Sequence, residues 1–107
     1  RSVALALEHL ADPAAAAPLA ALLGKPGMRG HAMTALRRRG AIEERTACLR
    51  EITLARALYR CGDHRGVARR ILRRYARDLR GLFSRHARAV LSEKPGHRPP
   101  HTGAYID

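Results

Sequence analysis

The chain has 107 residues, of which 21 are Lys or Arg and 9 are Asp or Glu, which gives a formal net charge of +12 and a pI near 11.5. This length suits one small domain or part of one, and no apolar run approaches the roughly 20 residues needed to span a bilayer. The charge suggests a polyanionic partner. However, all basic residues except Lys25 and Lys94 are Arg, and Ala is abundant, so the codon usage of a GC-rich bacterial genome also explains the arginine content.

The chain begins at Arg1 and has no signal-peptide pattern, so we expect it to be a segment of a longer protein. Cys48 and Cys61 are its only cysteines. If they share one continuous helix they lie about 20 Å apart, too far for a disulfide. We therefore expect two small core residues in a reducing, cytoplasmic compartment.

Helix formers dominate the first forty residues and no alternating β-branched run occurs, so the sequence predicts an all-α fold. A first helix is expected over 2–11 and a second over 13–23, with Asp12 as its cap and Pro13 at its first position. Gly24 is expected in the left-handed conformation that ends a helix. A third helix is expected over 28–39, with these residues facing inward: Met28, Ala32, Ala35 and Leu36.

Three more helices are expected in the second half of the chain. The helix over 42–61 has so broad an apolar face that it should contact neighbours on two sides. Asp63 should open a fifth helix, and a sixth should run over 80–92. Their expected inward residues are Val67, Ile71, Leu72, Tyr75 and Leu79 in the fifth helix, and Leu82, Phe83, His86, Ala87, Val90 and Leu91 in the sixth.

Residues 94–107 are rich in Pro, Gly and His and have little to bury, so a disordered tail is predicted. The expected organisation is a helical segment over 1–93 followed by this tail.

The stretch over 12–36 resembles a HEAT repeat. It has the Asp-Pro start, the pattern P-L-x-x-L-L at 18–23, Pro26 in the turn, Arg29 at the start of a second helix and A-x-x-A-L at 32–36. A weaker echo covers 62–91, and the long helix around Ile52 departs from the repeat period. The resemblance implies an α–α superhelix of about six helices, a fold that serves mainly as a scaffold or binding surface.

Three segments, at 58–63, 75–81 and 85–91, resemble the helical C-terminal region of some bacterial FAD-dependent oxidoreductases. This resemblance implies an FAD site in an upstream domain. The chain itself contains no strand followed by G-x-G-x-x-G, so we predict no cofactor-binding residue in this segment.

Other candidate sites have ordinary structural interpretations. The glycines over 24–30 lack the strand and the Lys-Ser/Thr of a phosphate-binding loop, so we interpret them as a turn. Cys61 and His64 have a spacing found in zinc sites but no further ligands, and His97 and His101 lie in the predicted tail. His86 is interpreted as a core or interface histidine. We predict no catalytic and no metal-binding residue.

The arginines of the fifth helix are the candidate anion- or partner-binding site. They form two rows at four-residue spacing, and the residues are Arg69, Arg70, Arg73, Arg74 and Arg77. Three interpretations stay open: a solvated face, a track for nucleic-acid phosphates, or a contact with an acidic protein or an upstream domain. A concave face that joins these arginines to residues 37–39 would favour DNA.

The favoured function is therefore a non-catalytic scaffold or interaction module at the C-terminus of a larger bacterial protein, which the second resemblance implies to be an FAD-dependent oxidoreductase. The alternatives are a nucleic-acid-binding module and a lid or wall of an upstream active site. A membrane partner is not expected.

Overall fold

Helices make up the regular structure of the chain. The computed structural model describes residue 6 and residues 8–34 and 44–96, and no strand occurs within these ranges. The elements are a 3-10 turn η1 (Pro13–Ala15) and the helices α2 (Ala16–Leu23), α3 (Arg45–Arg60), α4 (Val67–Ala76) and α5 (Gly81–Leu91). The all-α prediction is thus confirmed for the described residues. None of their helices is long and apolar enough to cross a bilayer.

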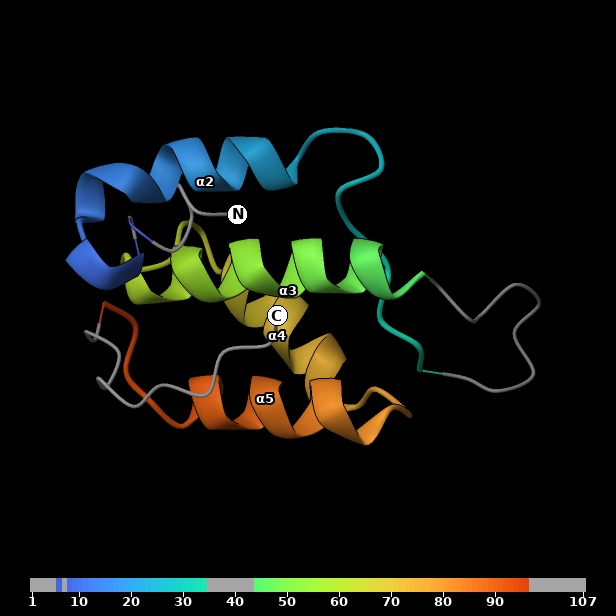
Figure 1. Ribbon diagram of the computed structural model, residues 1–107. Helices are drawn as coiled ribbons and strands as arrows, with labels where there is room; N and C mark the ends of the chain where they lie inside the picture. Colours follow the sequence, from blue (N-terminus) through green and yellow to red (C-terminus); the bar gives the residue numbers. More distant parts are fainter. Residues whose placement is uncertain (1–5, 7, 35–43, 97–107) are drawn as a thin grey trace.

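Helix α3 lies at the centre of the molecule. Figure 1 shows α2 along one side of α3 and α5 along the other, with α4 crossing behind. Every residue over 51–60 is buried, so the prediction that this helix contacts neighbours on two sides is confirmed. Cys48 lies in α3 and Cys61 follows it. Both thiols are buried and unbridged, as expected of small core residues.

Two aspartates cap helices as the sequence predicted. The Asp12 carboxylate accepts a hydrogen bond from Ala14 N at 3.0 Å, and Pro13 follows it in the first turn. Asp63 accepts hydrogen bonds from Ala68 N at 2.8 Å and Arg69 N at 3.1 Å. Although Asp63 caps α4, the helix begins only at Val67, because Gly66 takes a left-handed conformation with φ of 71°.

The helix predicted over 28–39 is wrong over residues 28–34, which form an extended segment, here called the strap. Gly27 and Gly30 have positive φ of 80° and 94°, which ends any helix there. Gly24, predicted to be left-handed, has a helical φ of −77°. Residues 35–39 lie outside the described residues, and so do residues 1–5 and 7 of the first predicted helix.

Side chains of distant helices hold the strap in place of helical hydrogen bonds. Glu51 accepts from Gly30 N at 2.9 Å and from His31 N at 3.0 Å. Asp78 accepts from Met33 N at 2.6 Å, and Leu79 N donates to the Met33 carbonyl at 2.9 Å. Three backbone N–H groups of the strap, those of Gly30, His31 and Met33, are therefore satisfied by tertiary contacts instead of helical hydrogen bonds.

The junction of α4 and α5 differs from the prediction in two side chains. Ile71, Leu72 and Tyr75 are buried as expected, and the rings of Tyr75 and Phe83 pack 5.8 Å apart. However, Leu79 and Leu82 are 46% and 42% exposed. Both were predicted to face inward, but α4 ends at Ala76 and α5 begins at Gly81, so the helical spacing does not extend through the turn.

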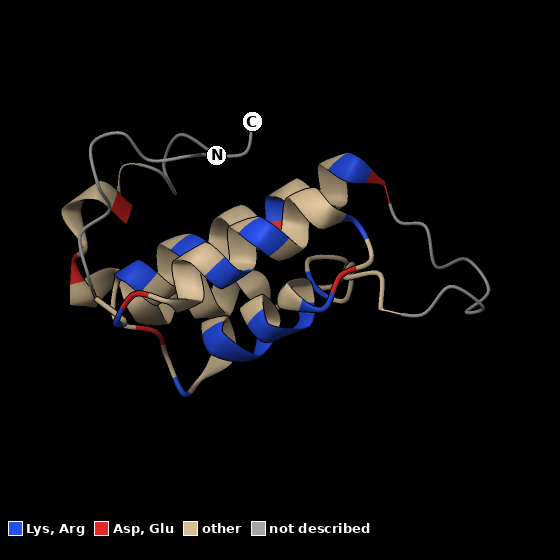
Figure 2. Ribbon diagram, turned by 90° about the horizontal axis from the view of Figure 1, so that it is seen from below, with Lys and Arg blue, Asp and Glu red and all other residues tan. Residues whose placement is uncertain are grey.

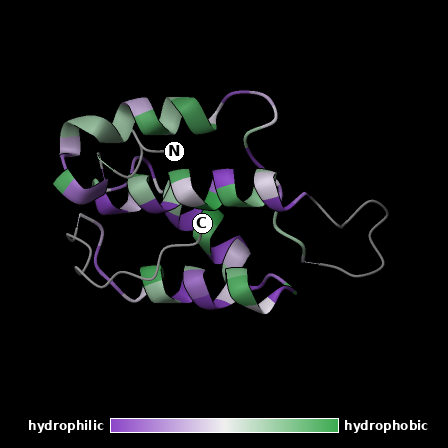
Figure 3. Cartoon of the chain, in the orientation of Figure 1, coloured by the Kyte–Doolittle hydropathy of each residue, from purple (hydrophilic) through white to green (hydrophobic). Residues whose placement is uncertain are grey.

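The described helices form a globule around α3 rather than a row of stacked pairs. The radius of gyration is 12.9 Å, close to the value of about 13 Å for a compact domain of this size. In Figure 3, α2 is hydrophobic along most of its length, whereas α5 alternates between hydrophobic and hydrophilic residues. Besides the 3-10 turn and the four α-helices named above, residues 6 and 8–10 are helical, as predicted for the first helix over 2–11, whereas the sequence predicted about six helices.

Most of the predicted tail lies outside the described residues. Its first three residues, 94–96, are described. Among them, Gly96 donates a backbone hydrogen bond to the Tyr59 carbonyl at 2.9 Å. The Tyr59 hydroxyl in turn donates to the Glu93 carbonyl at 2.6 Å. Hydrogen bonds therefore hold the segment after α5, as far as residue 96, against the end of α3.

Candidate functional site

The exposed side of α4 carries the predicted arginines, which we call the arginine face. All of them are exposed, while Ala68, Ile71, Leu72 and Tyr75 occupy the buried side of the same helix. Figure 2 shows Lys and Arg gathered along this helix. The separation arises because apolar and basic residues alternate at three- and four-residue spacing. The members of the arginine face are Arg69, Arg70, Arg73, Arg74 and Arg77.

No arginine of this face forms an ion pair with a described residue. Its one side-chain hydrogen bond within the described part of the chain runs from Arg70 Nη1 to the Arg65 carbonyl at 3.0 Å. The arginines at the end of α4 are favoured by the helix dipole, but Arg69 and Arg70 lie in the first turn, where a positive charge is unfavourable. Helix stability therefore does not explain the first two arginines.

The carboxylates that could neutralise this face point elsewhere. Glu8, Glu51 and Asp78 are buried, and Asp63 is committed to the start of α4. The Glu93 carboxylate pairs with Arg60 at 2.9 Å. Because these acidic groups are used inside the fold, the surplus positive charge of the chain lies at the surface.

A small hollow lies beside the arginine face, where the strap passes α4. It has a volume of about 280 Å³, and three arginines line it: Arg29 from the strap, and Arg70 and Arg74 from α4. Glu51 lies in its wall, but its carboxylate already accepts from Gly30 N, His31 N and the Tyr75 hydroxyl. The hollow therefore presents guanidinium groups from two segments of the chain.

The position of Arg29 beside α4 was not predicted from the sequence, because the HEAT-like pattern placed this residue at the start of a helix. Only the extended strap brings it to α4. Residues 37–39, which the sequence offered as further members of a basic surface, lie outside the described residues. The structure thus places four of the predicted arginines on α4 and Arg77 directly after its last residue, and it adds Arg29 to them.

A buried charge network lies on the other side of the core, at α3. Glu8 is fully buried, and its carboxylate accepts from Arg56 Nε at 3.0 Å and from Arg60 Nη1. Arg60 also pairs with Glu93. Arg56 Nη1 donates to His86 Nε2 at 3.0 Å, so His86 accepts this bond as a neutral imidazole. Among the described residues of this network, two carboxylates pair with two guanidinium groups, which offsets part of the cost of burying them.

The half-buried His86 predicts a loss of stability in acid. Burial, followed by the positive charges of Arg56 and Arg60, lowers the pKa of His86 from 6.5 to about 4. The unfolded chain therefore binds more protons between these values, and stability falls as the pH drops from about 6.5 toward about 4. Urea unfolding at several pH values should give a shallower dependence for His86→Asn than for the wild type. Equal dependences would contradict a neutral, buried His86.

The remaining candidates form no site in the described residues. Burial raises the pKa of the Cys61 thiol, which disfavours the thiolate that binds metal. No group of three or more His, Cys, Asp or Glu side chains arranged to hold a metal ion occurs in the described ranges. His97 and His101 lie outside those ranges. Burial, followed by the neighbouring Glu51, raises the pKa of Tyr75 above its usual range.

The comparisons with known proteins identify no family. No family model matches the chain, and neither the curated proteins nor the solved structures give a significant match. The HEAT-like and flavoenzyme resemblances therefore stay predictions from the sequence, and the geometry described above is the basis for the function.

Proposed function

We propose that this chain is a helical interaction module that binds the phosphate backbone of a nucleic acid through its arginine face. The observation that carries the proposal is the separation of charge. The buried acids are held inside the fold by partners of their own, while the arginines of α4 are exposed and form no ion pair with described residues. A surface of this kind attracts polyanions and releases their counterions on binding.

The geometry of the face suits a phosphate strand. Residues four apart in a helix are separated by about 6 Å along its axis, and phosphates recur every 3.4 Å or so along one strand of a duplex. Arg69 and Arg73 can therefore contact different phosphates of one strand. Arg29 and Arg74 extend the contact toward the hollow beside the strap.

The test is binding to a labelled mixed-sequence duplex at two salt concentrations. The wild type is compared with Arg69→Ala/Arg73→Ala/Arg77→Ala and with a control of equal charge change, Arg45→Ala/Arg85→Ala/Lys94→Ala. The control residues are also exposed. Each phosphate contact contributes about 0.9 to the slope of log affinity against log salt. We expect the α4 variant to lose about tenfold or more in affinity and about 2 to 3 in slope.

The control separates a specific face from total charge. We expect it to lose less than about threefold in affinity, since its residues belong to other parts of the chain than α4. Equal losses in the two variants would mean that the duplex responds only to net charge, and absence of salt-dependent binding by the wild type would overturn the proposal.

A second candidate is an acidic protein partner or neighbouring domain at the same corner of the molecule. The exposed side chains of Leu79 and Leu82 favour it, because they follow the last arginine of the face by two and five residues in the sequence. Apolar residues beside charges are typical of protein interfaces. This candidate agrees with what the two sequence resemblances imply, a HEAT-like scaffold in a longer FAD-dependent oxidoreductase. It predicts that Leu79→Ser/Leu82→Ser leaves duplex binding unchanged but abolishes capture of the acidic partner.

A further inference from the structure

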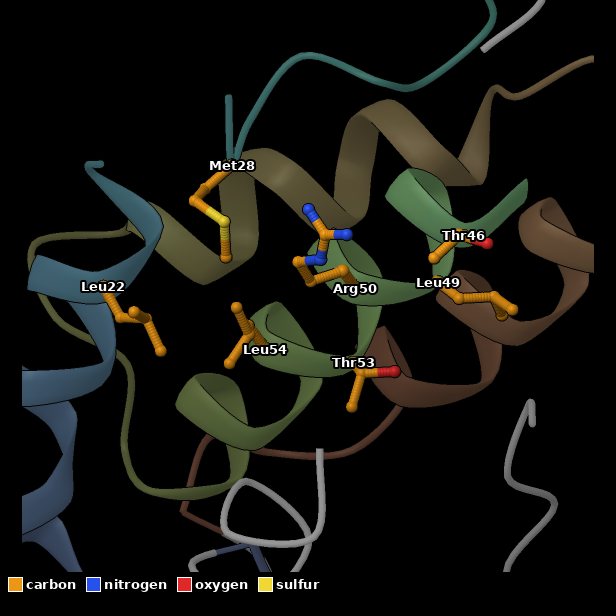
Figure 4. A pocket seen from close by; sticks show the side chains of 7 residues that line it. All are labelled: Leu22, Met28, Thr46, Leu49, Arg50, Thr53 and Leu54. Carbon is orange, nitrogen blue, oxygen red and sulfur yellow. The ribbon is translucent and has the colours of Figure 1, made fainter. Parts of the chain in front are cut away.

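A second pocket lies on the α2 side of α3, away from the arginine face. It has a volume of about 510 Å³ and lies where the end of α2, the start of the strap and α3 meet. Figure 4 shows Leu22 and Met28 across from side chains of α3. Leu49 and Leu54 complete its apolar wall. This volume is within the range of small-molecule sites, roughly 300–1,000 Å³.

One polar group in this pocket has no partner. Thr53 is 3% exposed, and its hydroxyl oxygen forms no hydrogen bond with any described residue. Buried hydroxyl groups nearly always have a partner, because leaving one unpaired costs its full desolvation. Thr53 lines the pocket, so a bound ligand could supply the missing hydrogen bond. We call this site the Thr53 pocket.

A single positive charge lies at the same pocket. Arg50 is exposed and lines it, and no ion pair or side-chain hydrogen bond of Arg50 occurs among the described residues. Arg50 and Thr53 are three residues apart on α3, so their Cβ atoms lie about 5–6 Å apart on one face of the helix. One carboxylate can therefore accept hydrogen bonds from both side chains at once.

We propose that the Thr53 pocket binds a small amphiphilic monocarboxylate. Its carboxylate accepts from the Arg50 guanidinium and the Thr53 hydroxyl, while its apolar body contacts Leu22, Met28 and Leu54. The flexible side chain of Met28 lets the wall adjust to bodies of different shape. This inference does not depend on the arginine face, since the two sites share no residue.

The test compares decanoate with decanol, which has the same chain length and no charge, both below the concentration at which decanoate forms micelles. Binding is followed by calorimetric titration of the wild type and of Arg50→Gln, Thr53→Val and Arg45→Gln. Arg45 is a matched control, because it is an exposed arginine of α3 that does not line the pocket. We expect decanoate to bind about fivefold more tightly than decanol, as a partly solvated charge pair allows.

The variants should separate the two contacts. Arg50→Gln should bring decanoate down to the affinity of decanol, Thr53→Val should weaken decanoate, and Arg45→Gln should change neither ligand. Thr53→Val should also unfold at higher urea concentration than the ligand-free wild type, because it removes an unpaired buried hydroxyl. Equal affinities for the two ligands, equal losses for Arg45→Gln and Arg50→Gln, or no binding at all would each overturn the proposal. Duplex binding by the same variants tests the arginine face separately.

Discussion

Replacing Glu8 with Gln is expected to lower the free energy of unfolding by about 3 kcal/mol or more, as for other buried pairs that lose one partner. The Glu8 carboxylate is fully buried and is the counter-ion of Arg56, which is 1% exposed, and of Arg60. The neutral amide keeps one acceptor but removes the negative charge that Glu8 places against the guanidinium groups of Arg56 and Arg60. Since domains of this kind are stable by only about 5–15 kcal/mol, the loss should be evident as a large shift of the urea midpoint.

The control for this experiment is Glu44→Gln. Glu44 is exposed and precedes α3 without capping it through its side chain, so its replacement should change stability by less than about 0.5 kcal/mol. Far-UV circular dichroism in urea measures both variants. Similar urea midpoints for Glu8→Gln and the wild type would show that the Glu8 carboxylate does not stabilise the fold through this network. A double variant with Arg56→Gln should recover part of the loss, because it removes a buried positive charge together with the carboxylate that pairs with it.

Replacing Asp78 with Ala is expected to cost about 2–3 kcal/mol and to release the strap. The Asp78 carboxylate is fully buried and accepts from Met33 N at 2.6 Å and from Arg80 N and Nε at 2.8 Å each. The side chain of Arg80 is 24% exposed, so solvent can compensate for part of its loss. Met33 N loses a part-buried hydrogen bond that fixes the strap to the residue before Leu79.

Two measurements check this expectation. Urea unfolding gives the change in stability against Glu44→Ala, and native-state hydrogen exchange reports the amides of Met33 and Leu79 individually. Both amides should exchange faster in Asp78→Ala relative to amides in the middle of α3. Unchanged protection of Met33 would mean that the carboxylate does not hold the strap.

Asp78 also contributes to acid sensitivity. Burial raises the pKa of its carboxyl, but the hydrogen bonds from Arg80 and from Met33 N outweigh burial and leave the pKa below its usual value of 3.8. The stabilisation is therefore present above the unfolded pKa and is lost as the pH falls below it. This window lies below that of His86, so pH titrations of the two variants can be told apart.

The partition of charge follows from these networks. Acidic residues are scarce in this sequence, and the fold uses Glu8, Glu51 and Asp78 to satisfy buried donors. An acid used in this way cannot neutralise a surface arginine. Among the described residues, the arginines of α4 are therefore left without a carboxylate that pairs with them.

The sequence by itself determined the helices and their faces. The spacing of Ile71, Leu72 and Tyr75 was sufficient to predict the buried side of α4 and hence the exposure of its arginines. Asp12 and Pro13 marked the start of the second predicted helix. These features depend on neighbours within a few residues along the chain, and periodicity and capping report such local preferences directly.

The tertiary structure decided the strap, the position of Arg29, and the pairing of buried charges. The strap has the composition of a helix, but its amides are bound by Glu51 and Asp78, which lie 20 to 45 residues away along the chain. Arg29 reaches α4 only because the strap is extended. No local pattern encodes these contacts, because a carboxylate satisfies a distant backbone amide only once packing has brought the two together. The same reason applies to the unpaired hydroxyl of Thr53, whose surroundings come from three separate segments.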